Sequence, residues 1–221
     1  MIDILTDNSS GVLPKVLPIF PLAGALLLPR GRLPLHIFEP RYVAMFEDAM
    51  ADSRMVGMVQ PLDPGNRETV VPVYRIGCAG RVTGFRDMEN GRYLVMLTGV
   101  SRFRFEHELE SVRGYRRVEP VWDGFAGDLC DGVCGGFDRG RLLGMLPCFL
   151  ETHDISANWD SIEGAPDERL VTSLAMICPF QPSEKQALLE APTLPERAVL
   201  LTSLIEMAVG HHRVGDRVAC H

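Results

Sequence analysis

The spacing of apolar residues changes near the middle of this chain. From about residue 12 to residue 122, apolar residues come in short runs bounded by Pro or Gly, as is typical of strands and loops. From about residue 125 to residue 210, they recur every three or four residues, as on one face of a helix. This change predicts an α+β protein, in which an antiparallel, barrel-like β domain with one inserted helix precedes a bundle of helices.

The first half begins with strands that one helix interrupts. Apolar runs predict strands over residues 16–20, 25–28 and 33–38, and a buried strand over 55–60. Between the last two, Pro40 fits the first turn of a helix, where a missing N–H costs little. Apolar residues then follow at helical spacing: Tyr42, Val43, Met45, Phe46, Ala49 and Met50.

From residue 74 onward the pattern is that of antiparallel strands. Residues 74–85 and 92–97 flank the dipeptide Asn90-Gly91, which accepts the positive φ angles of a hairpin turn. Over residues 101–108 aromatic residues alternate with basic ones, so we expect the aromatic side chains to face the core and the basic ones to face water or an acidic partner. The alternating residues are Phe103 and Phe105 with Arg102 and Arg104. Residues 115–122 are predicted to form the last strand.

The second half starts with a Gly-rich linker, residues 124–136, for which we predict no regular structure. A helix follows to about Glu151, which Pro147 should bend or divide. The next helix starts at the turn 166–168 and ends before Pro179. Two capping boxes predict the last two helix starts, at Ser183 with Gln186 and at Thr193 with Glu196. We therefore expect a β domain over 12–122, a helical bundle over 123–210 and a flexible tail over 211–221.

Composition and charge narrow the function. The chain has 221 residues, of which 46% are apolar, with 22 basic and 29 acidic residues and a net charge of -7. The excess of acid argues against broad capture of nucleic acid or of an anionic membrane. No basic signal-peptide region precedes an apolar stretch, and the most apolar segment, 17–29, is too short and too Pro-rich to span a membrane. We expect a soluble cytoplasmic protein whose six cysteines remain thiols.

The motifs of the common enzyme classes are missing from the sequence. The only lysines, Lys15 and Lys185, do not follow a glycine, so the chain has no P-loop. It also has no G-x-S-x-G elbow, no H-E-x-x-H and no G-x-G-x-x-G. We therefore expect no enzymatic activity, no catalytic residues and no cofactor. A hydrolase assembled from scattered Asp, Glu and His residues is the last alternative.

Two sets of residues raise the alternative of a metal site. Three residues separate Cys130 from Cys134, and Cys148, Cys178 or His153 could complete a zinc site. The second pair, Cys148 and Cys178, lacks the short spacing of structural zinc sites. Both lie among apolar helix residues, where small buried thiols are common, so we expect no metal. The second set, His211, His212, Cys220 and His221, lies in the polar tail, for which we favour a solvated role.

Two groups of charged residues have alternative interpretations. Glu39 and Arg41 flank Pro40 and could form an active-site pair; we favour Glu39 stabilising the helix start and Arg41 pairing with a neighbouring strand or loop. A basic cluster could hold RNA if it shared a face with exposed aromatic residues. We favour a solvated face, because acidic residues are interleaved. The cluster is Arg102, Arg104, Arg113, Arg116 and Arg117, and the acids are Glu106, Glu108 and Glu110.

Several segments resemble one protein family. Residues 17–42, LPIFPLAGALLLPRGRLPLHIFEPRY, are similar to the opening of the Lon protease N-terminal domain, and residues 74–105, YRIGCAGRVTGFRDMENGRYLVMLTGVSRFRF, to its central strands. LVTSLAMICPF from Leu170 and EKQALLEAPTLPERAVLL from Glu184 resemble its C-terminal helices. The resemblance implies a PUA-like β pseudo-barrel followed by a helical bundle. The residues that we assign to the family motif, with structural roles, are Leu35, His36, Phe38, Glu39, Pro40, Arg41, Tyr42, Arg102 and Phe103.

The resemblance implies a recognition module. Lon protease has an ATPase module and a Ser-Lys protease domain after this region, and we expect this chain to lack both. The IFEPRY form at residues 37–42 is closer to free-standing bacterial Lon-domain proteins, and to the Lon-like domains attached to RING fingers, than to the protease itself. We expect binding of protein or peptide segments, such as unfolded substrates or an adaptor, in a groove between the β domain and the helices. Homo-oligomers are compatible with this role. RNA or small-molecule binding is the alternative, because PUA-like folds also bind RNA.

Overall fold

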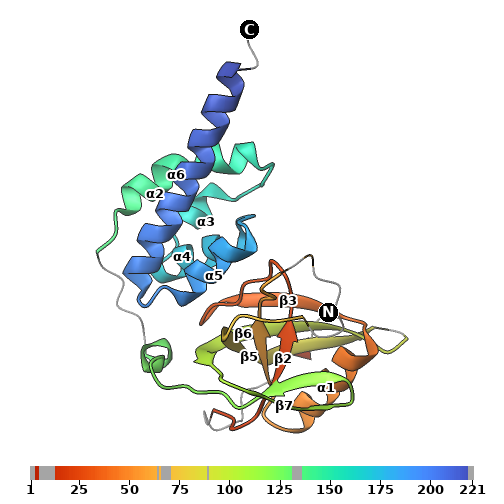
Figure 1. Ribbon diagram of the computed structural model, residues 1–221. Coiled ribbons are helices and arrows are strands. Elements are labelled where there is room, and N and C mark those ends of the chain that lie inside the picture. Colours follow the sequence, from red (N-terminus) through yellow and green to blue (C-terminus); the bar gives the residue numbers. More distant parts are fainter. Residues whose placement is uncertain are drawn as a thin grey trace. The chain divides into compact units, whose positions relative to one another are not determined.

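The structure is a computed structural model that describes residues 3–4, 13–63, 65, 71–88, 90–130 and 136–218, with the backbone alone at 3–4 and 211–218. The chain divides into two compact units, Met1–Asp131 and Gly132–His221 (Figure 1). The first is built on a β-sheet and the second on helices, which confirms the predicted α+β class. No helix of the described residues is both long and apolar enough to cross a membrane.

Eight strands form one sheet in the first unit. Their order is β3-β6-β5-β4-β2-β8-β7, with β1 paired to β5. All pairs are antiparallel except β2 with β4, which are parallel. The prediction of a wholly antiparallel domain is wrong at this pair, because the long connection through β3 and α1 brings the chain back in the same direction. The strands are β1 (Asp3–Ile4), β2 (Leu17–Pro21), β3 (Arg32–Ile37), β4 (Met55–Val59), β5 (Ile76–Met88), β6 (Arg92–Arg104), β7 (Glu108–Val112) and β8 (Tyr115–Val118).

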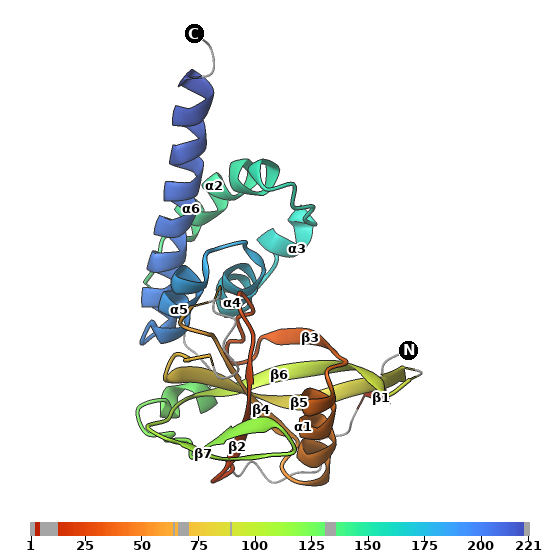
Figure 2. The same ribbon diagram turned by 45° about the vertical axis from the view of Figure 1, so that its right-hand side comes forward.

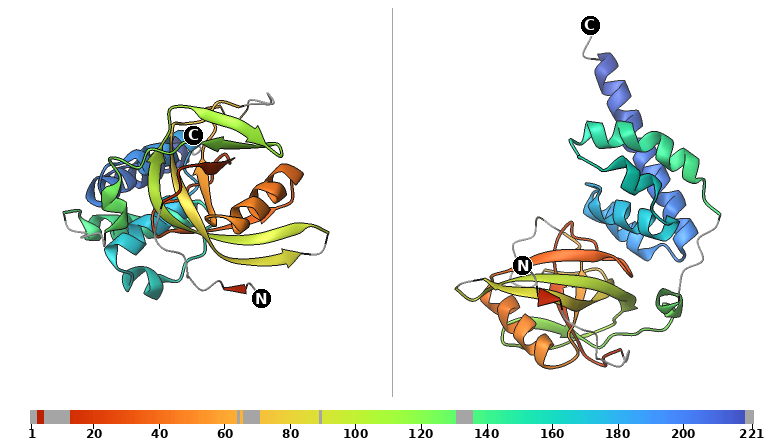
Figure 3. Two further views of the ribbon diagram at one scale, coloured as in Figure 1. Left: turned by 90° about the horizontal axis from the view of Figure 1, so that it is seen from below. Right: turned by 180° about the vertical axis from the view of Figure 1, so that it is seen from behind.

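The β5–β6 hairpin is the longest feature of the sheet. Asn90 and Gly91 have φ angles of 75° and 69°, as the predicted turn requires. Two register shifts, after Ala79 and after Val82, allow the pair to bend, as the left panel of Figure 3 shows. Strand β6 runs without a break to Arg104, so the two strands predicted over 92–97 and 101–108 are wrong as separate elements.

One predicted strand, residues 25–28, is instead a buried loop. Leu26, Leu27 and Leu28 are 2%, 1% and 0% exposed. The loop binds strand β6 by its backbone: Arg30 N donates to Gly99 O at 2.8 Å. A run of apolar residues indicates that the segment is buried. Burial alone does not distinguish a strand from a loop that packs against a sheet.

Helix α1 (Pro40–Ala51) is the inserted helix that the sequence predicted, and it covers part of the sheet. Pro40 occupies its first turn, and it packs on β2, β4 and β8 (Figure 2). Its buried residues are Tyr42, Ala44, Met45, Phe46 and Ala49. The main core lies between strands and consists of Leu17, Ile19, Met55, Val59, Val73, Ala79, Phe103, Phe105 and Val118.

The alternation predicted around Phe103 is confirmed. Phe103 and Phe105 are both 0% exposed, while Arg104 faces water. Arg102 is 5% exposed and has the acidic partner that the pattern allowed, Asp128 of the short 3-10 helix η1 (Ala126–Leu129). The Gly-rich linker thus contains a short element that the sequence did not predict, and contacts place η1 with the first unit.

The second unit is a small helical bundle. Its helices are α2 (Arg139–Thr152), α3 (Trp159–Glu163), α4 (Asp167–Ile177), α5 (Pro182–Glu190) and α6 (Leu194–Val218), of which α3 was not predicted. Helix α6 packs against α2, α4 and α5 (Figures 1 and 2). Pro147 lies inside α2 without dividing it. The backbone of 211–218 continues α6 beyond the helix end predicted near residue 210.

The two predicted capping boxes have different outcomes. The one at Thr193 is confirmed: its N–H donates to Glu196 Oε2 at 3.1 Å, and Glu196 N donates to Thr193 Oγ1 at 3.3 Å. The one at Ser183 is wrong, because α5 already begins at Pro182. Glu184 there accepts a 2.7 Å hydrogen bond from the N–H of Gln181, the residue before the helix. Proline at the first helical position therefore moved the start two residues earlier.

Candidate functional site

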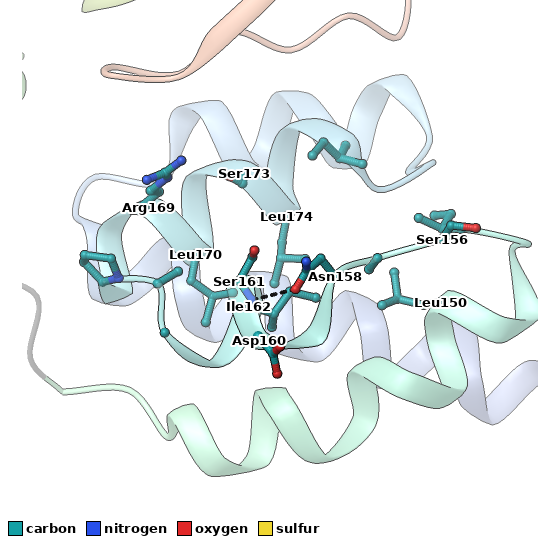
Figure 4. A pocket seen from close by; sticks show the side chains of 16 residues that line it. Leu150, Ser156, Asn158, Asp160, Ser161, Ile162, Arg169, Leu170, Ser173 and Leu174 are labelled. Carbon is teal, nitrogen blue, oxygen red and sulfur yellow. Dashed lines mark hydrogen bonds between the residues drawn. The ribbon is translucent and has the colours of Figure 1, made fainter.

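A groove with a volume of about 550 Å³ lies within the helical unit (Figure 4). One wall is a face of α4, and the other is formed by the end of α2, the segment that follows it and α3. Such a volume is in the range of sites that bind peptides or small molecules. The leucines and isoleucines of its lining are Leu150, Ile155, Ile162, Leu170, Leu174 and Ile177, and its polar lining includes Asn158, Asp160, Ser161, Arg169 and Ser173.

Local sequence builds each wall. Pro166, just before α4, and residues 170, 173 and 177 of the helix recur at intervals of three or four, so that their side chains line one face. The opposite wall depends on α3, whose start is capped by Asn158: its Oδ1 accepts a 3.0 Å hydrogen bond from Ser161 N. Many of the groove residues therefore lie on helices α3 and α4 and not only on loops.

Ile177 is the most exposed large apolar residue on this wall, at 65%. The buried residues of α4 include Leu170, Val171, Leu174 and Ala175, and Ile177 continues the side of Leu170 and Leu174 into the last turn, where it is exposed to water. The sequence prediction missed the groove, because the spacing of Ile177 alone does not distinguish it from a core residue.

Lys185 holds the end of α4. Its side chain is buried, at 7% exposed, and Nζ donates to the carbonyl oxygen of Met176 at 3.2 Å. Burial lowers the pKa of Lys185 from its ordinary value, since desolvation disfavours the ammonium form. The bond supports the last turn of α4, next to Ile177.

The family-motif residues divide into buried and exposed sets. Leu35 and Tyr42 are 6% and 7% exposed, and Tyr42 stacks on Phe20 with ring centroids 4.1 Å apart. His36 and Phe38 lie on the exposed side of β3 and its end, with centroids 5.7 Å apart. Together with Phe103 and Arg102, already placed, these residues belong to the first unit, whereas the residues that line the groove belong to the second.

Glu39 and Arg41 pair with each other. Arg41 Nε donates to Glu39 Oε2 at 3.1 Å, and both side chains are about half exposed, at 46% and 47%. Glu39 precedes α1 but makes no side-chain cap, and Arg41 lies over the ring of Tyr42. The described contacts thus pair Arg41 with Glu39 rather than with a neighbouring strand or loop, and stabilisation of the helix start by Glu39 stays a prediction. The geometry is that of a surface ion pair, which contributes little stability.

The basic cluster is largely compensated by acids. Arg104 pairs with Glu106 at 3.6 Å, and Arg116 pairs with Glu108. Arg113 binds two carboxylates of α1, Glu47 at 2.9 Å and Asp48 at 2.7 Å, and this raises the pKa of the guanidinium. Arg117 donates to the carbonyl oxygen of Glu110. These contacts agree with the solvated face that we favoured over an RNA surface.

The residues of the zinc hypothesis are only partly described. Cys134, Cys220 and His221 lie outside the described residues, as do the side chains of His211 and His212. Among the described side chains, no three His, Cys, Asp or Glu residues gather as metal ligands would. Cys178 is 1% exposed, and burial raises the pKa of its thiol to about 12, whereas a zinc ligand must be a thiolate.

Burial of the Cys178 thiol leads to a testable difference in reactivity. When native protein is treated with iodoacetamide near pH 8, Cys130, which is exposed, is expected to react, while Cys178 is expected to remain unmodified. Peptide-level mass spectrometry measures both. Denatured protein is the control, in which Cys178 should react as readily as Cys130. Equal labelling of the two in native protein would contradict this account.

Comparisons with known proteins show which family the chain is similar to. Residues 16–123 match the family described as the ATP-dependent protease La (LON) substrate-binding domain. Lon protease 2 of Myxococcus xanthus is 31% identical over 200 residues, covering 87% of this chain and 24% of the relative. Lon protease of Anaeromyxobacter dehalogenans is 32% identical over 117 residues, covering 50% of this chain and 13% of the relative. The chain thus spans about a quarter or less of these relatives.

Two solved structures share the fold. The Lon N-terminal domain protein from Xanthomonas campestris aligns with a TM-score of 0.59 at 21% identity, covering 85% of this chain and 97% of that one. The N-terminal domain of Lon protease from the Mycobacterium avium complex aligns with a TM-score of 0.61 at 15% identity, covering 87% and 98%. The likeness includes the helical unit, since it extends well beyond residues 16–123.

Proposed function

Because residues 16–123 belong to the Lon substrate-binding domain family, we propose that this protein is a recognition module that binds segments of other polypeptides without catalysing their reaction. The observation that carries the proposal is the apolar groove of the helical unit, with Ile177 65% exposed at its side. An exposed apolar side chain beside a concave apolar surface is a feature of binding sites.

The groove suits unfolded or extended segments. Apolar walls take up apolar side chains, and the hydroxyl and amide groups of Ser161, Ser173 and Asn158 can pair with a peptide backbone. A folded protein buries most of its large apolar side chains, whereas an unfolded chain offers them. A groove between the two units, as the sequence suggested, stays a prediction.

We assign a structural role to the family motif. Leu35, Tyr42 and Phe103 are buried, and Arg102 is paired inside the first unit. Binding of RNA is the weaker alternative, because the basic side chains that would hold it are bound to acids or to a backbone carbonyl. Self-association is compatible with the proposal and is not required by it.

Replacing Ile177 with aspartate is expected to weaken binding of an unfolded polypeptide by about tenfold or more, since burying one large apolar side chain contributes about 1.5–3 kcal/mol. The probe is fluorescein-labelled α-lactalbumin, kept unfolded by reduction and alkylation, and fluorescence anisotropy gives Kd. Because Ile177 is exposed in the free protein, the variant should remain folded.

Val199→Asp is the matched control. Val199 is 55% exposed on α6 of the same unit and does not line the groove, so this change should leave Kd unaltered. Native α-lactalbumin should not bind. Absence of binding by the unfolded probe, or equal losses in the two variants, would remove the support for the groove as the binding site.

A further inference from the structure

One end of the groove, here called the closed end, is bounded by the connection between its walls. Residues 164–166 join α3 to α4, and Gly164, Ala165 and Pro166 themselves line the groove. A polypeptide that lies along α4 meets this connection at the start of the helix, where it can turn aside or end.

One cation stands at the closed end. Arg169 is the only Lys or Arg among the described residues that line the groove, and it lies in the first turn of α4, close to Pro166. The start of α4, where the helix dipole is positive, adds to this positive potential and favours an anionic group there. In Figure 4, Asp160, the carboxylate of the lining, points away from α4, and Leu170 and Ile162 lie between it and Arg169.

Arg169 has no partner among the described residues. The carboxylates near it in sequence are already engaged: Asp167 binds Arg139, Glu163 accepts a 2.8 Å hydrogen bond from Trp159 Nε1, and the adjacent Glu168 has a partner other than Arg169. On α4, the positions three and four residues away carry no acid, so no helical neighbour can neutralise it. Its guanidinium therefore offers two parallel donors to a carboxylate that comes from outside.

We propose that the groove binds the C-terminal end of a polypeptide, with apolar side chains along α4 and the α-carboxylate at Arg169. The inference rests on the proposed function and names its ligand. Helix α4 has 11 residues and is about 16 Å long, which holds about five extended residues. Ser173 and Asn158 can bind the backbone of the bound peptide. Ile177, at the other end of α4 from Arg169, contacts the peptide side chain that is farthest from the α-carboxylate.

A pair of peptides tests the proposal on the full-length protein. Both are fluorescein-labelled, about ten residues long to exceed the groove, and end in Leu-Val-Ala-Leu; one has a C-terminal carboxylate and the other a C-terminal amide. We expect the carboxylate form to bind about fivefold tighter or more at low salt, because it adds a charge-assisted pair with Arg169. The difference should shrink as ionic strength rises.

Arg169→Gln should remove the preference for the carboxylate and leave the Kd of the amide peptide unchanged. Arg86→Gln is the matched control, since Arg86 is exposed in the first unit and its loss changes the net charge equally. This control should keep the preference. Arg169 is exposed, so the variant is expected to remain folded.

Three results would overturn the proposal. Equal Kd values for the two peptides would exclude the α-carboxylate, while continued sensitivity of both to Ile177→Asp would leave the groove as a peptide site. An amidated peptide with Glu as its last residue that binds as tightly as the carboxylate form would show that any acidic group suffices. If neither peptide binds and the unfolded probe does not bind either, the proposed function fails with it.

Discussion

Replacing Asp128 with alanine is expected to destabilise the first unit by about 3–5 kcal/mol, because it leaves a buried guanidinium without its counterion. Asp128 Oδ2 accepts hydrogen bonds from Arg102 N and Nε, both at 2.9 Å, and Oδ1 accepts one from Nη2 at 2.9 Å. The two side chains are only 8% and 6% exposed, and Arg102 also lies over the ring of Phe125. Water can replace little of this network unless η1 detaches.

Tryptophan fluorescence during urea unfolding measures the effect. The protein has two tryptophans, so a Trp159→Phe background leaves Trp122, which packs on Phe103 in the first unit, as the reporter. Replacing both partners, as in Arg102→Met with Asp128→Leu, should recover most of the lost stability, because no buried charge then remains. A free energy of unfolding of Asp128→Ala within about 0.5 kcal/mol of the parent would contradict this role.

Replacing Gly99 with alanine is the second change for which we expect a large loss, of about 3 kcal/mol or more. A Cβ atom at this position would lie 2.0 Å from the carbonyl oxygen of Leu28 and 2.7 Å from its carbonyl carbon. These are backbone atoms, which cannot rotate aside. The loop is also bound next to the contact, since Gly99 N donates to Gly31 O at 2.8 Å. Relief requires the loop 26–31 to move off β6.

Gly127→Ala is the matched control in the same unit. A Cβ at Gly127 meets nothing within 4 Å, so we expect a change within about 0.5 kcal/mol. Both variants are measured by the Trp122 fluorescence described above. If Gly99→Ala unfolds at the urea concentration of the parent, the close approach of the loop to β6 is not required for stability.

Much of the fold could be predicted from local pattern. The hairpin at Asn90 and Gly91, the first turn at Pro40 and the capping box at Thr193 each depend on a few adjacent residues, whose conformational preferences persist in the folded chain. Errors occurred where the same residues fit two structures. Ser183 fits a cap as well as a first turn, and Pro182 decides between them.

The candidate site was harder to predict, because its residues are distant in sequence and ordinary in type. From the sequence alone, we would assign Leu150, Ile162 and Leu174 to the core. Only the packing of the helices shows that a groove lies between them. The sequence does not distinguish Arg169 from the other arginines. Only the structure shows that the nearby carboxylates of Asp167 and Glu163 bind other residues. Whether a charge is compensated depends on its distance in space from opposite charges, and this distance cannot be derived from the spacing of residues along the chain.

Local patterns in the sequence predicted the α+β class and the order of the β unit and the helical unit, because hydrophobic periodicity and turn chemistry act between near neighbours. The family of residues 16–123 was indicated instead by the resemblance of whole segments, such as residues 17–42. Only the tertiary structure decided that residues 25–28 are a loop on β6, that Arg102 is buried against Asp128, and that α3 and α4 enclose a groove. These features depend on which surfaces meet after folding, since packing and pairing act between segments that the sequence keeps far apart.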